Sequence, residues 1–444
     1  MTNKNLEVKL SLAGLTGIVI SSMVGSGVFS LPQNMASGAG AGAVLLAWII
    51  TIAGMYFIMS VFRLLSVLKP QIVTGVYAYA QDGFGKKAGF LTLWGYWLSA
   101  VVANTGYAVI LMESLNYFFP PYFAGGNNLN SLLLSSCIIW GFFWLASRGI
   151  KTAVAVNLIG TVSKFVPLLI FITACAAAFK LSLILLEVKS VFSGKIAAAD
   201  LLAQIKSTML ITLWCFIGIE TAFAISASAR SQGEVSKATF LGFLISASVY
   251  VLISLLPFGV LPRERLAAFA NPSTAGVLEA LIGHAGGAVM ALGLIVSVLF
   301  SWLSWFIISA EVPFAAVKNG AALPSKFAVV NRFGAPVVSL AASALISQII
   351  MALAFFSGKA WEMLVSVTGV MILPVYLITA VYLFKITSKK RFARAVAALG
   401  AVYSLWLLYA ADLKYLLMGL ILFLLGAPVF IFALRERGKY KNAP

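Results

Sequence analysis

Two apolar stretches of this chain carry glycine-containing breaks whose residue types suit the binding of a solute. The first break covers residues 21–27 (SSMVGSG), and the second covers residues 212–220 (TLWCFIGIE). Each break interrupts a run long enough to cross a bilayer, and a membrane helix exposes backbone amides and carbonyls at that depth only where they line a cavity. Two such breaks in corresponding places predict a solute site near the middle of the membrane.

The second break also carries an aromatic ring and a carboxylate. Trp214 precedes Gly218 by four residues, and Glu220 follows it by two. An aromatic face can hold an ammonium, a guanidinium or an alkyl chain, and the cation–π contact is worth ~2 kcal/mol when desolvated. Backbone amides around residues 25–27 would meet a carboxylate, while unwound carbonyls near Gly218 would receive an ammonium. These groups together predict a zwitterionic amino acid with a long or cationic side chain.

Few ionisable residues lie inside the apolar runs. An unpaired charge near the bilayer centre costs on the order of 3 kcal/mol or more, so each one is a functional candidate. Glu220 is interpreted as a carboxylate that attracts a cationic solute or takes part in gating, or else as a member of a structural ion pair or a buried neutral acid. Lys164 could be a fixed cation in place of a coupling sodium, a protonatable group, or a lysine paired with backbone carbonyls at a helix break. Glu311 and Glu113 can also reach the membrane interface, which is the favoured interpretation for Glu113.

The elements that must position these residues are membrane helices. The chain of 444 residues is 61% apolar and 10% charged, with a mean hydropathy of +1.02, which excludes an ordinary soluble protein. The apolar runs lack the two-residue alternation of a membrane β-barrel. A crossing needs ~20 apolar residues, so we predict an all-α polytopic membrane protein with about twelve spans. The spans are expected to start near Leu12, Ala43, Phe90, Leu132, Val154, Met209, Phe240, Ala288, Val337, Met363, Val396 and Leu416.

The basic residues are distributed unevenly between the two sides of the predicted membrane. Most of the 31 lysine and arginine residues fall on the side of the amino terminus. This positive-inside bias predicts that both termini are cytoplasmic. It also explains the net charge of +18 better than binding to a polyanion does, so the lipid bilayer is an expected partner and nucleic acid is not.

The positions of the breaks predict the domain organisation. If spans one to five form one unit and spans six to ten another, a broken helix opens each unit. The two units then have opposite orientations, because five is odd. We therefore predict an inverted repeat of residues 1–180 and 181–390, followed by two additional helices and a cytoplasmic tail in residues 391–444.

The residue inventory does not suit an enzyme or a metal site. His284 is the only histidine, and one histidine makes neither a metal cluster nor a catalytic dyad. We expect no enzyme activity, no catalytic residue, no metal and no cofactor. An ion channel or a receptor is also disfavoured, because neither needs two discontinuous helices in matching places.

In its motifs the chain resembles the amino acid–polyamine–organocation superfamily and, within it, the basic amino acid/polyamine antiporters. The motifs are residues 23–32 (MVGSGVFSLP), 74–79 (TGVYAY), 212–220, 311–320 (EVPFAAVKNG) and 334–337 (GAPV), which extend over nearly the whole chain. The glycine-serine-glycine sequence alone is typical of the superfamily, and the combination is more discriminating. The resemblance implies a LeuT-type five-plus-five inverted repeat with discontinuous helices one and six, in a bacterial inner membrane.

The resemblance also implies which residues bind the substrate. Met23, Ser26 and Gly27 match the residues at the α-carboxylate and α-ammonium groups. Trp214 matches a tryptophan that packs on the aliphatic part of the substrate. Asn104 keeps the spacing of the residue that contacts the guanidinium.

Further residues match parts of the gating machinery of these antiporters. Glu220 matches a proton-sensing, gating glutamate, and Trp305 falls where a second gating tryptophan is expected at the substrate. Lys164 matches a lysine that occupies the lost sodium site in several relatives. Glu311, a further gating candidate, stands where the arginine:agmatine branch usually has a glutamine, which favours arginine:ornithine or lysine exchangers.

The resulting expectation is a secondary transporter that exchanges a cationic amino acid, with arginine favoured, for ornithine or agmatine by alternating access. The alternative is proton-coupled or facilitated uptake of a basic amino acid such as lysine or histidine without obligatory exchange, which Lys164 would support. Relatives are often dimers, so a homodimer is also considered.

Overall fold

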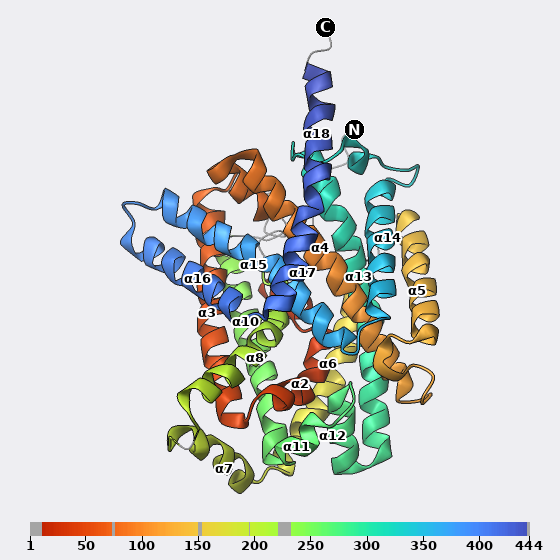
Figure 1. Cartoon of the computed structure of the whole chain (residues 1–444), viewed down its shortest axis with the longest axis vertical. Coiled ribbons are helices and arrows are strands. Elements are labelled where there is room, and N and C mark those ends of the chain that lie inside the picture. The colour runs from red at the N-terminus through yellow and green to blue at the C-terminus, as the bar shows by residue number, and fades with distance from the viewer. Residues whose placement is uncertain (1–10, 73–75, 150–152, 195, 221–231, 442–444) are drawn as a thin grey trace.

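The structure is a computed structural model that describes residues 11–72, 76–149, 153–194, 196–220 and 232–441. These residues form helices and connecting turns, with no strand among them (Figure 1). The helices are α1 (Leu12–Met23), η1 (Ser26–Ser30), α2 (Leu31–Gly38), α3 (Ala41–Leu68), α4 (Val76–Asn116), η2 (Ala124–Gly126), α5 (Leu129–Ser147), α6 (Ala153–Ala177), α7 (Leu181–Phe192), α8 (Ala198–Phe216), α10 (Gln232–Leu255), η4 (Leu256–Gly259), α11 (Arg263–Ala267), α12 (Ser273–Ile282), α13 (His284–Lys318), η5 (Ser325–Ala328), α14 (Val337–Ala354), α15 (Ala360–Ile386), α16 (Arg391–Ala410), α17 (Leu413–Leu424) and α18 (Gly426–Lys441).

The described helices are long and apolar enough to confirm the predicted all-α polytopic fold. Within the described residues, nine helices could cross a membrane, or eleven if each of two bent pairs counts as one span. The first bent pair joins Leu12–Met23 to Ser26–Gly38 at 52°, and this bend is the first predicted break. The predicted sixth span corresponds to α8, and residues 221–231, which would continue it, lie outside the described residues.

A short helix that the sequence did not suggest precedes the third predicted span. We expected the span to start near Phe90, but α4 starts at Val76 and bends at Gly85, where φ is 85°. The polar residues 81–87 (QDGFGKK) had the composition of a loop. A glycine can adopt this positive φ at little cost, so a short helical segment precedes the bend. We call residues 76–84 the amino-terminal segment of α4.

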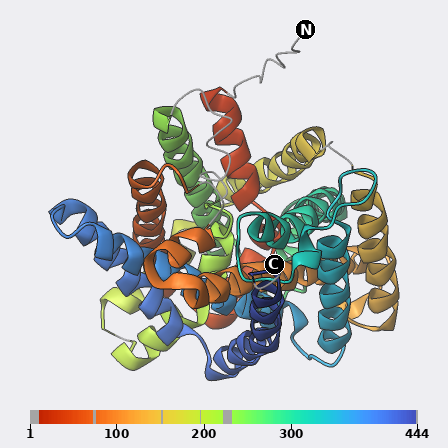
Figure 2. The same ribbon diagram turned by 90° about the horizontal axis from the view of Figure 1, so that it is seen from above.

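The helices surround a centre formed by α4, α13 and α15. Helix α4 packs against both α13 and α15, and α6 packs against α13. Around this centre, α1 packs against α10 and α8 packs against α3. The hairpin of α15 and α16 reaches one edge of the molecule and α5 lies at the opposite edge (Figures 1 and 2). In Figure 1, α18 projects from what we call the upper end, and α2, α7, α11 and α12 lie at the opposite, lower end.

Buried side-chain hydrogen bonds join helices from the two predicted units. The Trp48 indole nitrogen on α3 donates to Ser254 Oγ on α10 at 2.7 Å, and the hydroxyls of Thr51 and Thr212 lie 2.7 Å apart between α3 and α8. In a membrane interior such polar groups have no water to bind, so pairing between helices satisfies them. These bonds fix α3 against α8 and α10.

The contact between α3 and α16 depends on the small size of Gly54. The ring of Tyr403 lies so close that a Cβ atom on Gly54 would overlap it. Gly54→Ala is therefore expected to lower the melting temperature, because forced overpacking costs about 1–3 kcal/mol. Thermal unfolding in detergent, followed by tryptophan fluorescence, measures the change.

Gly17→Ala in α1 is the matched control, because no atom lies within 4 Å of a Cβ atom built on Gly17. Alanine favours a helix over glycine by about 1 kcal/mol, so this variant should melt at the same temperature or higher. Equal melting temperatures for the two variants would contradict the packing argument.

Candidate functional site

The first break is held by a buried lysine from another helix. Helix α1 ends at Met23 and η1 begins at Ser26, so the last carbonyls of α1 lack the usual helical partners. The Lys164 ammonium on α6 donates to the carbonyl oxygens of Ser21 at 3.1 Å and Val24 at 2.8 Å. Lys164 is only 1% exposed. Its pairing with backbone carbonyls at a helix break is one of the interpretations that the sequence left open.

The second break touches the first. Helix α8 ends at Phe216, and Gly218 has a φ of 107°, which favours glycine over any residue with a side chain. The hydroxyl of Ser22, in the first break, donates to the Gly218 carbonyl oxygen at 3.3 Å. The indole of Trp305 lies within 3.3 Å of the position of a Cβ atom on Gly218. The two predicted breaks are therefore neighbours in space.

A small cavity lies between the two breaks. Its volume is about 20 Å³, which is room for about one water molecule. The cavity brings together three of the predicted substrate residues with side chains from α4. Its lining includes Ser22, Met23, Tyr96, Tyr107, Trp214 and Trp305.

Trp214 separates the small cavity from a much larger one. Gly27 lies against its indole so closely that a Cβ atom on Gly27 would overlap the ring. Trp214 also contacts Trp361. The two rings meet edge to face, with 5.9 Å between their centroids. Trp361 lines a cavity of about 730 Å³ that is bordered by α2, the start of α8 and the turn before α17 at the lower end. That volume lies in the range of ligand pockets, ~300–1,000 Å³.

Glu220 lies behind Tyr96, one of the residues that line the small cavity. Its carboxylate accepts hydrogen bonds from the hydroxyls of Tyr96 at 3.2 Å and Tyr376 at 3.1 Å, and from the Gly218 amide at 3.3 Å. Glu220 is 5% exposed. Among the described residues these partners are neutral, so the geometry corresponds to a hydrogen-bonded acid. Among the residues that the structure describes, no basic side chain forms an ion pair with Glu220.

Asn104 and Ser26 are buried beside the cavity but do not line it. Asn104 on α4 is fully buried, and its amide nitrogen donates to Ser309 Oγ at 3.3 Å. The Asn104 side-chain oxygen and the Ser26 hydroxyl are buried without a hydrogen-bond partner among the described residues. A buried polar atom left unpaired costs about 1–3 kcal/mol. Both atoms therefore retain the capacity to bind a polar group.

Two acidic candidates lie away from these contacts. Glu311 is exposed on α13 and lines neither the small nor the large cavity. Glu113 is half-buried and lines the large cavity toward the lower end, and its interpretation as an interface residue stays a prediction. The structure does not bring Glu311 to the site. No group of three histidine, cysteine, aspartate or glutamate side chains in the described residues could hold a metal ion.

Four aromatic residues of the site were not predicted: Tyr96, Tyr107, Trp361 and Tyr376. A buried tyrosine hydroxyl needs a polar partner, so a tyrosine deep in an apolar span signals a polar neighbour. Tyr376 follows residues 370–375 (VMILPV) and carried this signal. This signal predicts that Tyr376 has a polar partner but not which residue it is. The partner is Glu220, which follows α8.

Removal of the Lys164 ammonium should destabilise the protein. Lys164→Met removes the hydrogen bonds from the ammonium to the carbonyls of Ser21 and Val24, and a buried acceptor left unpaired, such as that of Val24, costs about 1–3 kcal/mol. We expect a lower melting temperature in detergent. Lys180→Met is the matched control, because Lys180 is exposed and should leave the melting temperature unchanged. A Lys164→Met protein that melts with the wild type would show that the bonds to α1 contribute nothing to stability.

Comparison with known proteins assigns the family. The profile described as amino acid permease matches residues 10–436. A Chlamydia abortus protein named arginine/agmatine antiporter is 48% identical over 436 residues, which cover 96% of this chain and 90% of the relative. A Chlamydia pneumoniae protein of the same name is 47% identical over 456 residues, which cover 100% of this chain and 93% of the relative. The chain therefore belongs to the amino acid permease family, in the amino acid–polyamine–organocation superfamily that its motifs resemble.

Proposed function

We propose that this protein exchanges arginine for agmatine across a bacterial inner membrane by alternating access. The observation that carries the proposal is the near full-length similarity to proteins named arginine/agmatine antiporter. The sequence feature that favoured ornithine was Glu311. Because Glu311 is exposed and lines neither cavity, its identity carries little weight for the choice of the exchanged amine.

The two breaks offer a set of groups that suits arginine. The backbone amides around residues 25–27, with Met23 beside them, receive the α-carboxylate, and the carbonyl of Gly218 receives the α-ammonium. The aliphatic part of the side chain packs on Trp214. The unpaired Asn104 oxygen accepts a hydrogen bond from the guanidinium, which has five donors and no acceptor.

Alternating access requires that the site opens to one side at a time. The small cavity has room for about one water molecule, so its walls must separate to admit an amino acid. Trp214 and Trp361 form the wall toward the lower end, while Glu220, Tyr96 and Tyr376 form the wall toward the upper end. Trp305 borders the cavity as a further gating residue. Glu220 exchanges a proton when this second wall opens.

Lys164 takes the place of a coupling cation in this mechanism. Its ammonium is fixed on the carbonyls of Ser21 and Val24, so the first break carries a positive charge without bound sodium. Proton-coupled uptake of a basic amino acid without exchange is the second candidate function. The same buried amine favours it, because a lysine in a membrane interior is a group that can release a proton.

Helix packing supports the predicted inverted repeat. Helices α1, α3, α4, α5 and α6 form the first unit, and α8, α10, α13, α14 and α15 form the second. The contact of α1 with α10 corresponds to that of α8 with α3, and the contact of α4 with α15 corresponds to that of α13 with α6. With both termini in the cytoplasm, the upper end is cytoplasmic and the large cavity belongs to the external side.

Reconstitution tests the exchange directly. Labelled arginine should enter proteoliposomes at least tenfold faster when they are loaded with agmatine than when they are empty. Loading with ornithine separates the two candidate amines. Equal uptake into loaded and empty vesicles would favour the uptake mechanism without exchange and contradict the proposal.

The predicted contact with the substrate stem makes Trp214 a second test. Trp214→Ala should weaken arginine binding about thirtyfold, because burying the aliphatic stem is worth ~2 kcal/mol at about 0.8 kcal/mol for each methylene, and each 1.4 kcal/mol is a factor of ten. Binding is measured by titration calorimetry in detergent. Trp140→Ala is the control, because Trp140 on α5 is 42% exposed. A binding constant within twofold of the wild type for Trp214→Ala would remove Trp214 from the site.

A further inference from the structure

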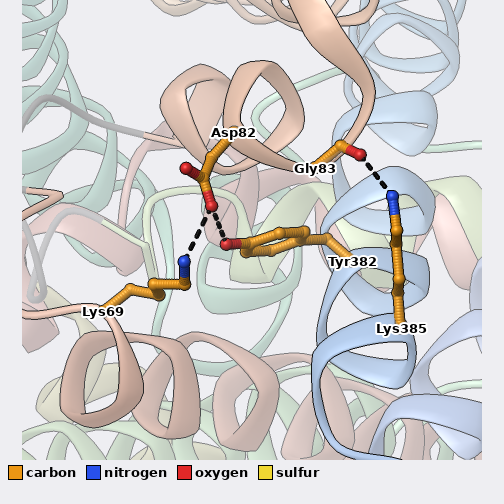
Figure 3. Close-up of polar contacts among 5 residues, drawn as sticks. All are labelled: Lys69, Asp82, Gly83, Tyr382 and Lys385. Carbon is orange, nitrogen blue, oxygen red and sulfur yellow. Dashed lines mark hydrogen bonds and ion pairs between the residues drawn. The ribbon is translucent and has the colours of Figure 1, made fainter.

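A cluster of polar contacts lies at the upper end, beyond the residues that form the site (Figure 3). The Lys69 ammonium, directly after α3, lies 2.9 Å from Asp82 Oδ2 in the amino-terminal segment of α4. The hydroxyl of Tyr382 on α15 donates to the same carboxylate oxygen. One carboxylate therefore joins three helices.

A second group of contacts holds the same segment to α15. The Lys385 ammonium donates to the Gly83 carbonyl oxygen at 2.7 Å and lies 5.0 Å above the Phe84 ring. Tyr79 stacks on Tyr382 at 6.1 Å between centroids. Gly83 also packs directly on the Tyr382 ring. The amino-terminal segment of α4 is thus attached to α15 along its length.

This attachment forms a second layer above the Glu220 wall. Tyr376, which binds Glu220, and Tyr382, which binds Asp82, are both on α15 and six residues apart. A helix rises ~1.5 Å per residue, so the two layers are separated by about 9 Å along α15. A route from the small cavity to the upper end along α15 passes both layers.

The segment is joined to the rest of α4 by a single non-helical glycine. It joins the rest of α4 at Gly85, whose φ is 85° and around which no atom lies within 4 Å of a Cβ position. Such a bend with open space leaves room for a change of angle. Hinges of this kind are a few residues that absorb the backbone change while the flanking elements stay intact.

Stability alone is a weak reason for the Lys69–Asp82 pair. The side chains of Lys69 and Asp82 are 28% and 43% exposed, and ion pairs at this exposure add little to the free energy of unfolding. The hydrogen bond with Asp82 is the main cause that raises the pKa of Lys69 above its usual value, so the pair stays charged at neutral pH. A weak but persistent contact suits an element that must be released in each cycle.

We propose that residues 76–84 form a latch that closes the upper end of the substrate path and must detach from α15 for exchange. The latch rests on the proposed exchange function, and it adds to that function a moving element outside the binding site. A covalent cross-link between the segment and α15 should block transport, because the segment could no longer detach. Loss of the Asp82 contact should loosen the segment.

A reversible cross-link tests whether release is required. The pair Asp82→Cys and Lys385→Cys is introduced with Cys137→Ser, since Cys137 is exposed whereas Cys175 and Cys215 are buried. Treatment of the purified protein in detergent with a short bis-methanethiosulfonate before reconstitution should lower arginine exchange at least tenfold, and reductant applied before reconstitution should restore it. The single variant Asp82→Cys with the same reagent is the control. Cross-linked protein that exchanges within twofold of the untreated protein would overturn the latch.

A second measurement does not depend on transport. Asp82→Asn should speed hydrogen–deuterium exchange of backbone amides in residues 76–84 at least fivefold, and the reversed pair Lys69→Asp with Asp82→Lys should return it toward the wild-type rate. Glu436→Gln is the matched control, because Glu436 on α18 accepts a hydrogen bond from the Ser325 amide outside the segment. An Asp82→Asn segment as protected as the wild type would contradict the latch.

The two experiments separate the latch from the exchange function. If the unmodified protein fails to exchange arginine, the exchange function is wrong, and hydrogen exchange still decides whether Asp82 holds the segment. If the unmodified protein exchanges arginine and the cross-link has no effect, the latch alone is wrong.

Discussion

The structure depends on one constraint, which is that backbone groups freed by a helix break must be satisfied without water. At the first break the ammonium of Lys164 meets this need with two carbonyl oxygens. At the second break the hydroxyl of Ser22 binds the Gly218 carbonyl oxygen. Both solutions use a side chain from outside the broken segment. Satisfying the backbone therefore ties α1 to α6 and to the end of α8, and the small cavity lies between these ties.

The breaks and their ionisable residues could be read from the sequence because their signals are local. A glycine-serine-glycine sequence, or a charged residue among apolar ones, is unusual in a membrane span, so residues 25–27, Lys164 and Glu220 stood out. The partners could not be read in the same way. Tyr376 lies 156 positions from Glu220, and only the tertiary fold determines which of many buried aromatic residues meets a given acid.

The early start of α4 shows a different limit. Residues 81–87 are rich in glycine and charge, which are typical of a loop, yet residues 76–84 form a helix before the bend at Gly85. The composition of residues 81–87 correctly predicts that they are largely exposed, but it does not predict the helical backbone. Here long-range contacts of Asp82 and Gly83 with α15 stabilise the helix, and contacts of this kind override local propensity.

The two sides of the small cavity are closed in physically different ways. Toward the lower end, two tryptophan rings in edge contact separate it from a cavity of about 730 Å³. Such an aromatic contact is worth about 0.5–1.5 kcal/mol beyond its buried area. Toward the upper end, a buried acid with two tyrosine partners is followed by the contacts of Asp82 and Lys385. The contacts toward the upper end are therefore mainly polar, whereas those toward the lower end include the aromatic contact of Trp214 with Trp361 and the close packing of Gly27 on Trp214. Opening the two sides must break contacts of different kinds.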